Sequence, residues 1–230
     1  MREILECGNS RPFRPYYDWV ADEVLKAVEK GRIKCVAEYG AGTAPISRRI
    51  AKDPRSAGLR LIVCDSNPDL TAYTMLKGEH PEKVFPLFEP VDFKDLQNWD
   101  SGTLVFLSAA LHHVPHQIRN DLIKRLRGSA SRIMVFEPLR KDILSVLFVI
   151  LSLIPALLLP VWFINRPGAL RRVVYCWVLP VAPFMFLWDG FVSCLRQWTE
   201  FEWKEALPKT LGRMSENTLN NSLFCQSVSW

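Results

Sequence analysis

The sequence has few cysteines and no two of them at short spacing. Six cysteines occur in 230 residues, none within a C-x-x-C motif, and several lie inside apolar runs. That pattern argues against a disulfide framework and favours buried free thiols in a reducing compartment. The chain also lacks a long run of Lys and Arg. Because its formal net charge is only +5, we do not expect it to bind nucleic acid.

Charged residues are absent from two long stretches in the second half of the chain. Residues 143–165 and 173–188 carry no charge, whereas the segment between them contains Arg166, Arg171 and Arg172. An uncharged run of about 20 residues is long enough to cross a bilayer as a helix. Two prolines interrupt each run, however. At about 1.5 Å per residue, the second run is also shorter than a hydrocarbon core of about 30 Å.

The arginines between the two stretches help to choose a topology. Lys and Arg in short loops tend to stay on the cytoplasmic side, so a hairpin of two spanning helices would export Arg166, Arg171 and Arg172. A bent, monotopic insertion keeps them at phosphate level on the cytoplasmic face of a membrane. We therefore expect a hydrophobic helical hairpin that dips into one leaflet. Two alternatives stay open, namely a two-span topology and a soluble apolar lid or homodimer interface.

Two glycines follow the first apolar strand of the chain. Residues 33–50 indicate a short buried strand, a turn and a helix that begins at Pro45. The acidic Glu38 ends the strand, and the turn contains Gly40 and Gly42. Glycine lets a ligand approach the backbone, and the free N–H groups of the first helical turn then face that ligand. A dinucleotide fingerprint requires a third glycine where Pro45 stands, so this class of site is disfavoured.

The segment Glu38-Tyr-Gly-Ala-Gly-Thr-Ala44 resembles the first motif of the class I S-adenosylmethionine (SAM)-dependent methyltransferases, an acidic residue followed by x-G-x-G-x-G. Ala44 replaces the last glycine of that motif. The resemblance covers most of the chain outside residues 143–188 and implies SAM as the cofactor. It implies a cofactor site made by Glu38, Gly40, Gly42, Thr43, Asp65, Ser66, Asn67, Asp92, Phe93 and Ser108.

Asp65 carries the second part of the resemblance. It lies at the end of a second apolar strand, residues 59–66, and follows Gly42 by 23 residues. A carboxylate at this strand tip can accept hydrogen bonds from both hydroxyls of a ribose. In the family, Ser66 and Asn67 would lie beside the adenine. After the third strand, Asp92 and Phe93 match further adenine-binding positions of the family. A turn acid followed by a core aromatic would explain the same two residues.

Paired histidines follow the fourth predicted strand, within residues 103–115. The resemblance places the strand tip, with Ser108, beneath the sulfonium, and His112 and His113 near the acceptor. An imidazole titrates near working pH and can take a proton from a nucleophile as it is methylated. Adjacent histidines in an extended loop point apart and no acidic or cysteine ligand accompanies them, so we expect no metal. A structural hydrogen bond from one of the pair stays an alternative.

Further residues around the acceptor follow from the resemblance. Glu137, at the tip of the fifth strand, would orient a histidine or the acceptor, or cap the next helix. Tyr16 and Tyr17 lie in an aromatic lead that often folds over cofactor and substrate in the family, although they would also anchor a helix to the core. Asp189 and Arg196 match positions before the last helix that can face the acceptor.

Strand and helix patterns alternate over residues 20–139, which predicts a parallel sheet covered by helices on both faces. Ligands of such sheets bind at the carboxyl ends of the strands. With the resemblance, we expect a Rossmann-like, seven-stranded methyltransferase sheet with an inserted hydrophobic helical hairpin. The expected parts are a SAM-binding core over residues 1–142, the hairpin over 143–188 and the rest of the core over 189–230, with an edge strand over 219–230.

Together these features predict a SAM-dependent methyltransferase that acts on an amphiphilic or lipid-like acceptor at a membrane surface. The resemblance supplies the reaction. The apolar hairpin follows the fifth strand at the edge of the site, and it suggests a lipid head group, an isoprenoid quinone precursor or a long-chain aromatic as acceptor. Two other functions stay open: a membrane-anchored binding or assembly protein without transfer, and a soluble methyltransferase whose insertion is a lid or dimer interface.

Overall fold

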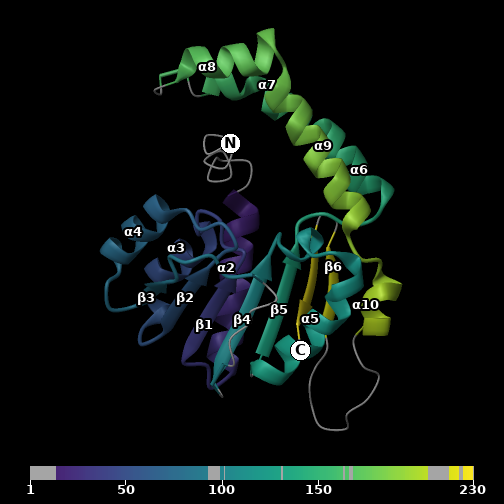
Figure 1. The fold of residues 1–230 in the computed structure, drawn as a ribbon. Coiled ribbons are helices and arrows are strands. Elements are labelled where there is room, and N and C mark those ends of the chain that lie inside the picture. Colours follow the sequence, from purple (N-terminus) through teal and green to yellow (C-terminus); the bar gives the residue numbers. More distant parts are fainter. Residues whose placement is uncertain are drawn as a thin grey trace.

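A single sheet forms the centre of the molecule (Figure 1). The computed structural model describes residues 14–92, 99–100, 102–130, 132–162, 164–165, 168–206, 218–222 and 225–229. The strand order is β3-β2-β1-β4-β5-β7-β6. Five strands pair in parallel and confirm the predicted parallel sheet: β1 (Cys35–Tyr39), β2 (Arg60–Cys64), β3 (Val84–Pro86), β4 (Thr103–Ser108) and β5 (Arg132–Glu137).

Two antiparallel strands extend the sheet beyond β5. Strand β7 (Cys225–Ser229) pairs with β5, and β6 (Thr218–Ser222) pairs with β7. The expectation of one edge strand over residues 219–230 is therefore wrong, because the chain reverses between the paired residues Ser222 and Cys225. An alternating pattern predicts strand conformation, but it does not show where the chain turns back.

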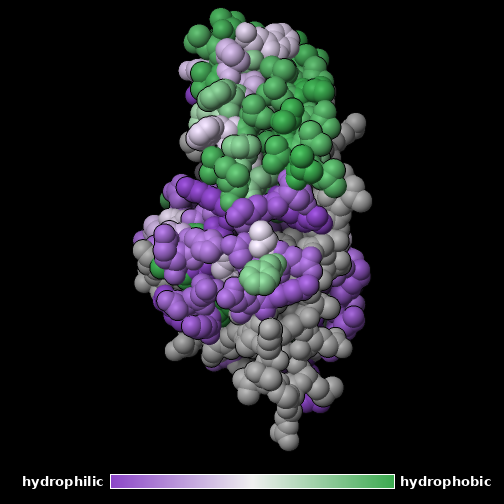
Figure 2. Space-filling model, turned by 90° about the vertical axis from the view of Figure 1, so that its right-hand side faces the viewer, coloured by the Kyte–Doolittle hydropathy of each residue, from purple (hydrophilic) through white to green (hydrophobic). Residues whose placement is uncertain are grey.

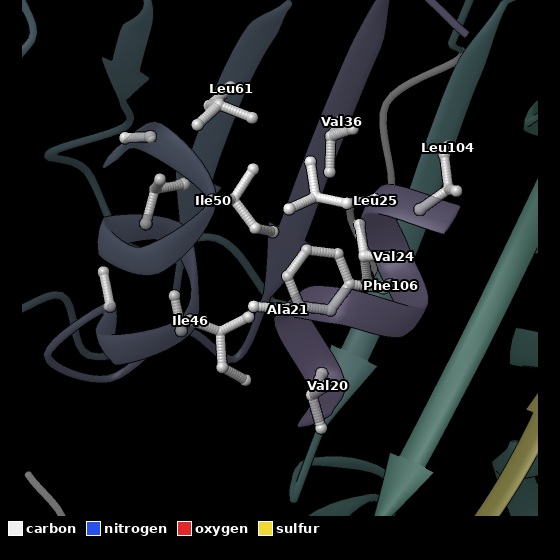
Figure 3. Close-up of a cluster of buried hydrophobic side chains, with 14 of the residues drawn as sticks. Val20, Ala21, Val24, Leu25, Val36, Ile46, Ile50, Leu61, Leu104 and Phe106 are labelled. Atoms are coloured by element: carbon white, nitrogen blue, oxygen red, sulfur yellow. The ribbon is translucent and has the colours of Figure 1, made fainter. Parts of the chain in front are cut away.

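Helices cover both faces of the sheet. Side chains of β1 and β4 alternate between the faces, so both strands are buried on both sides. Figure 3 shows Val36, Leu104 and Phe106 in one cluster with residues of α2 and α3. On the other face, Val105 and Leu107 share a cluster with residues of α5 and α10. The helices of this sheet domain are α2 (Arg14–Lys30), α3 (Pro45–Lys52), α4 (Leu70–Glu79), α5 (His116–Ser129) and α10 (Glu200–Ala206).

Residues 143–196 project from the sheet domain as an arm. In Figure 1, α6 and α9 lie side by side and rise from the edge where β5 ends, and α7 and α8 lie at the far end. Gly190 permits this pairing, because a Cβ atom there would lie 2.8 Å from Val149 Cγ1. The elements of the arm are α6 (Ile143–Leu151), α7 (Leu153–Trp162), α8 (Ala169–Val173), a π-helix (Val174–Val178) and α9 (Val181–Arg196).

The boundary that we predicted between residues 188 and 189 lies inside a helix. Helix α9 continues from the arm down to the sheet domain without a break. An uncharged run ends at its first charged residue, Asp189, but a helix continues as long as its backbone hydrogen bonds do. Charge therefore marked a change of environment along one helix rather than a boundary between two elements.

The arm exposes most of the apolar surface of the molecule. Of the 26 large apolar side chains that the described residues expose, 22 lie between Ile143 and Leu195. Figure 2 shows apolar side chains over most of one face of the arm and hydrophilic side chains directly below it. Within the described part of the chain, no helix alone has the length and hydropathy to cross a bilayer. The segments Ala169–Val178 and Val181–Arg196 reach the necessary length and hydropathy only together, and the two are bent by 68° relative to each other.

Candidate active site

The turn after β1 contains three alternate residues with positive φ. The angle is 70° at Gly40, 54° at Gly42 and 54° at Ala44. This left-handed conformation suits glycine, whereas it costs alanine about 1–2 kcal/mol. Ala44, which stands where the methyltransferase motif has glycine, thus adopts a conformation that favours glycine. A Cβ atom on Gly42 would meet no other atom within 4 Å, so the space beside the turn is open to a ligand.

Asp65 follows β2 directly and faces that turn. Its Oδ2 accepts a hydrogen bond from Gly42 N (2.7 Å), and its Oδ1 accepts one from Asn67 N (2.7 Å). The Asp65 carbonyl accepts a bond from Val91 N (2.9 Å), which holds the loop after β3 at the same edge of the sheet. A carboxylate has about four acceptor positions, so about two remain for donors such as ribose hydroxyls.

Glu38 is buried beside the turn and does not face the open space. It is 2% exposed, and its Oε2 accepts hydrogen bonds from Ser47 N (3.1 Å) and Ser47 Oγ. Burial raises the pKa of Glu38 to about 7, although the Ser47 bonds oppose this rise; nearby Asp65 adds to it. These bonds join the end of β1 to α3. Glu38 therefore supports the turn, and its contact with a cofactor stays a prediction.

The lead helix α2 reaches the carboxyl end of the sheet. Tyr16 Oη lies 2.9 Å from Ser108 Oγ and donates a hydrogen bond to the Phe136 carbonyl (3.3 Å). Tyr17 is half-buried, and the guanidinium carbon of Arg49 lies 5.3 Å from its ring centroid. Both tyrosines therefore lie near the predicted site and also anchor α2 to the core, so the two readings of the sequence are compatible.

The backbone is strained where β4 ends. Ala109 has a φ of 52°, and its N–H donates a hydrogen bond to the Phe136 carbonyl (2.8 Å). Strain of this kind costs of order 1–3 kcal/mol and persists only where the surrounding contacts enforce it, often at functional sites. Here it precedes a short 3-10 helix, η4 (Leu111–His113), which carries both predicted histidines.

His112 belongs to a buried polar network around Glu137. The Glu137 Oε2 atom lies 2.8 Å from His112 Nδ1 and accepts a bond from Gln197 Nε2 (2.8 Å), while Oε1 accepts one from Leu111 N (2.8 Å). Burial alone would raise the pKa of Glu137, but the His112 charge and these hydrogen bonds hold it below its ordinary value. Glu137 thus contacts one of the two predicted histidines, and its role, like that of His112, stays a prediction.

His113 has the opposite environment. Its side chain is exposed, and its ring centroid lies 4.1 Å from that of His112. Partial desolvation and the adjacent His112 lower the pKa of His113, whereas Asp189 and Glu137 act to raise it and Arg196 to lower it. An accessible imidazole with a lowered pKa is neutral near pH 7 and can accept a proton. His113, not His112, is therefore the candidate base.

Helix α9 brings the predicted acceptor residues to the histidines. Asp189 and Arg196 are exposed and lie seven residues apart, about two turns, so they share one face of the helix. Both act on the pKa of His113, which Asp189 raises and Arg196 lowers. Ser193 lies between them on the same face and is buried. The arm thus contributes a polar strip at its base, beside η4.

The other predicted cofactor residues lie in loops at the same edge. Thr43 belongs to the turn after β1, Ser66 and Asn67 follow Asp65, and Asp92 lies in the loop after β3. Phe93 lies outside the described residues. The described parts of the chain contain no group of three or more His, Cys, Asp and Glu side chains that could hold a metal ion.

Two residues of the site escaped the sequence analysis. Gln197 completes the Glu137 network, and Arg119, on α5, donates hydrogen bonds to carbonyls of the histidine turn. Neither belongs to a motif or follows a strand directly. Their roles depend on how α5 and α9 pack together, and no local pattern encodes that.

Solved methyltransferase structures share this fold. A magnesium protoporphyrin IX methyltransferase from Synechocystis PCC 6803, with bound SAH, matches with a TM-score of 0.55 and 14% identity, over 100% of this chain and 98% of that one. The plantazolicin methyltransferase BpumL, also with SAH, matches with a TM-score of 0.57 and 13% identity, over 90% and 67%. A Nostoc punctiforme PCC 73102 protein assigned as an O-methyltransferase matches with a TM-score of 0.56 and 12% identity, over 94% of this chain and 57% of that one.

Sequence comparison adds nothing to this likeness, because no protein-family model and no curated protein matches the sequence. The chain spans only 57% of the length of the Nostoc protein. Identities of 12–14% show a shared fold and do not transfer an activity or a substrate. The parallel sheet, the glycine turn and these neighbours together establish that the chain has the fold of the class I SAM-dependent methyltransferases.

Proposed function

We propose that this chain is a SAM-dependent methyltransferase. The observation that carries the proposal is the hydrogen bond between Gly42 N and Asp65 Oδ2, which joins the glycine turn to the tip of β2 beside open space. In doubly wound sheets, this crevice at the carboxyl ends of the strands is where ligands bind. Two of the solved neighbours with this fold hold SAH, the product that SAM leaves after methyl transfer.

The residues of this edge fit an adenosine with a charged tail. Gly42 leaves the backbone accessible, Asp65 retains free acceptor positions for ribose hydroxyls, and Asp92 lies in the loop that Val91 ties to Asp65. Ser108, with Tyr16 beside it, closes the site at the tip of β4. Bound SAM would supply an electrophilic methyl group. The chain itself would supply orientation and, for a protonated acceptor, a base.

His113 is the residue that would take the proton. Its ring is exposed at the carboxyl edge, whereas the Nδ1 of His112 is paired with Glu137 and that ring is buried. Asp189 and Arg196 both act electrostatically on His113, and they offer one acidic and one basic group to an acceptor head group. General-base catalysis by a positioned imidazole typically contributes about 10²–10⁴ in rate.

The acceptor, in this proposal, is an amphiphile held at the cytoplasmic face of a membrane. The arm exposes 22 large apolar side chains, more than an ordinary monomer surface presents in one place. Trp177, Trp188 and Tyr175 are among them, and such aromatic residues favour the membrane interface. Arg171 and Arg172 on α8 suit lipid phosphates. Neither α6 nor α7 is long enough to span a bilayer, and the pair Ala169–Val178 and Val181–Arg196 is bent by 68°, which together favour a monotopic arrangement.

The base of the arm is also the edge of the candidate site. Asp189 and Arg196 belong to α9, and η4 with His113 lies beside this helix. An amphiphile whose tail stays in the bilayer would therefore present its head group next to His113. The two solved neighbours are named for other substrates, plantazolicin and magnesium protoporphyrin IX. The position of the arm is what supports a lipid-like acceptor.

Calorimetry with SAM, followed by transfer of a labelled methyl group to vesicles of a total lipid extract, tests the proposal. We expect binding and transfer by the wild type, and loss of both in Asp65→Ala. Absence of SAM binding in the wild type would reject the cofactor. Binding without transfer to any lipid fraction would favour the non-catalytic binding protein, and transfer to soluble acceptors by a dimeric protein would favour a lid or dimer interface.

A further inference from the structure

Arg119 is a buried arginine whose hydrogen bonds in the described structure all go to backbone carbonyls, and its guanidinium carbon lies 5.9 Å from the Trp198 ring centroid. It lies on α5 and is 2% exposed. Its Nε donates to the Val114 carbonyl (2.8 Å), its Nη2 to the His112 carbonyl (3.0 Å) and its Nη1 to the Arg196 carbonyl (2.6 Å). The guanidinium thus joins three peptide groups from two distant parts of the chain.

The three carbonyls have a common neighbour. His112 and Val114 are the residues on either side of His113, and Arg196 is the last residue of α9. Arg119 therefore holds the backbone before and after His113 and fastens it to the end of the arm. Glu137 does the same from the other side, through Leu111 N, the His112 ring and Gln197. Two buried charges thus hold η4 and the end of α9 together.

We propose that Arg119 is a positioning residue for His113, and that it makes the histidine turn and the arm move as one unit. This inference rests on the proposed function, because it takes His113 to be the base. Membrane contact at the arm would then reach the imidazole through the Arg196 carbonyl rather than through the sheet. The candidate base is held from its backbone, which leaves its ring free for an acceptor.

The chemistry of Arg119 favours this role over a purely stabilising one. Burying a guanidinium is unfavourable unless its hydrogen bonds are satisfied, and an apolar residue often stabilises such a position as well. Burial lowers the pKa of Arg119, although the charges of Glu137 and Glu202 oppose this. A planar fork of five donors can reach three divergent carbonyls at once, which a lysine ammonium on its flexible stem does not reproduce.

His113 itself reports on this arrangement. The charged or titratable groups that act on it are His112 and Glu137 from the buried network and Asp189 and Arg196 from α9. Desolvation is the main cause of its lowered pKa, with His112 next. If the turn loosens, His113 becomes more hydrated, and its pKa rises toward the ordinary value of about 6.5. The pKa of His113 therefore measures how firmly the turn is held, without any need for an acceptor.

The test is an NMR titration of the imidazole C–H signals in the full chain, which has only four histidines. His113→Asn assigns the relevant signal. We expect Arg119→Lys to raise the pKa of His113, and the signal of His80, in the cap of α4, serves as an internal reference. Lys124→Gln, which removes an exposed charge on the same helix, should leave the pKa of His113 unchanged. An unchanged pKa of His113 in folded Arg119→Lys would overturn the proposal.

A second variant covers the case in which Arg119→Lys does not fold. Gln197→Leu removes one bond between the end of α9 and Glu137 and leaves Arg119 in place. It should raise the pKa of His113 by a smaller amount, and no change would count equally against the coupling. SAM calorimetry on the same samples distinguishes failure of the proposed function from failure of the role of Arg119. Wild-type protein that does not bind SAM refutes the proposed function, whereas normal SAM binding with an unmoved His113 refutes only the role of Arg119.

Discussion

The sheet domain and the arm differ in where their apolar side chains lie. In the sheet domain, apolar residues are buried between the strands and the covering helices, and buried polar groups such as Glu38 and Glu137 are paired with protein donors. In the arm, most large apolar residues face outward. The packing of the sheet domain covers its apolar side chains, whereas the arm leaves most of its large apolar side chains uncovered. The candidate site lies where the two regions meet.

The largest expected effect comes from making the arm polar. Ile154→Asp with Phe184→Asp places two carboxylates on exposed apolar positions. Each exchange costs about 3 kcal/mol in a bilayer, so binding to phosphatidylethanolamine/phosphatidylglycerol vesicles should fall more than about 100-fold in a flotation assay. The matched control is Leu70→Asp with Met75→Asp, equally exposed on the sheet domain. If both double variants bind vesicles equally well in flotation, the arm is not the membrane contact.

In the sheet domain, removing a buried hydrogen-bond acceptor tests whether the pairing of buried polar groups stabilises the fold. Glu137→Ala leaves Leu111 N, His112 and Gln197 without their common acceptor. The free energy of unfolding should fall by about 3–5 kcal/mol, measured by urea denaturation. Glu137→Gln keeps part of the network and should lose less. A loss below about 1 kcal/mol for the alanine variant would mean that the network does not hold the domain together.

Glu38 predicts a pH dependence of stability. Its pKa is about 7 in the folded protein against an ordinary value of 4.5, so between these pH values the folded state binds more protons than the unfolded state. Stability from this group is therefore complete below pH 4.5 and is lost as the pH rises to 7, by about 3 kcal/mol. Denaturation curves at several pH values should show this slope, and Glu38→Gln should flatten it. Identical slopes would refute a raised pKa.

Asp65 should matter for binding more than for folding. Asp65→Ala removes the bond from Gly42 N and, under the proposed function, the acceptor for two ribose hydroxyls. Hydrogen bonds to a charged group contribute about 1.5–3 kcal/mol each, so we expect SAM affinity to fall by about 100-fold or more in calorimetry. Glu82→Ala, which removes an exposed acid beyond the end of α4, should bind SAM normally. Equal affinities in both variants would contradict the placement of the ribose.

The smallest effect concerns the strained turn. Ala44→Gly relieves a φ of 54° but increases the entropy of the unfolded chain, so stability should rise by only about 0.5–1 kcal/mol. Ala72→Gly, inside α4 where φ is helical, should instead lose about 1 kcal/mol. Thermal denaturation of both variants measures the contrast. A loss in Ala44→Gly would show that the lost burial of the Ala44 methyl group outweighs the relief of strain.

The parallel sheet and the cofactor edge of the site were accessible from the sequence. Apolar strands alternated with helices, and Gly42 and Asp65 each followed a strand, so topology alone brings them to one edge. The reversal between β6 and β7 was not predicted, and neither was the continuous helix α9 across residue 188. Both depend on hydrogen bonds between or along elements, which hydropathy does not report.

By itself, the sequence determined what is local or periodic: the strands, the glycine turn, the paired histidines and the two uncharged stretches. Only the tertiary structure decided the different roles of the histidines, because burial of His112 against Glu137 and exposure of His113 arise from contacts between η4, β5 and the end of α9. The same holds for Arg119, whose three acceptors lie up to 77 residues away. Neighbouring positions in a sequence share their chemistry, but packing gives each its own solvent, partners and charge.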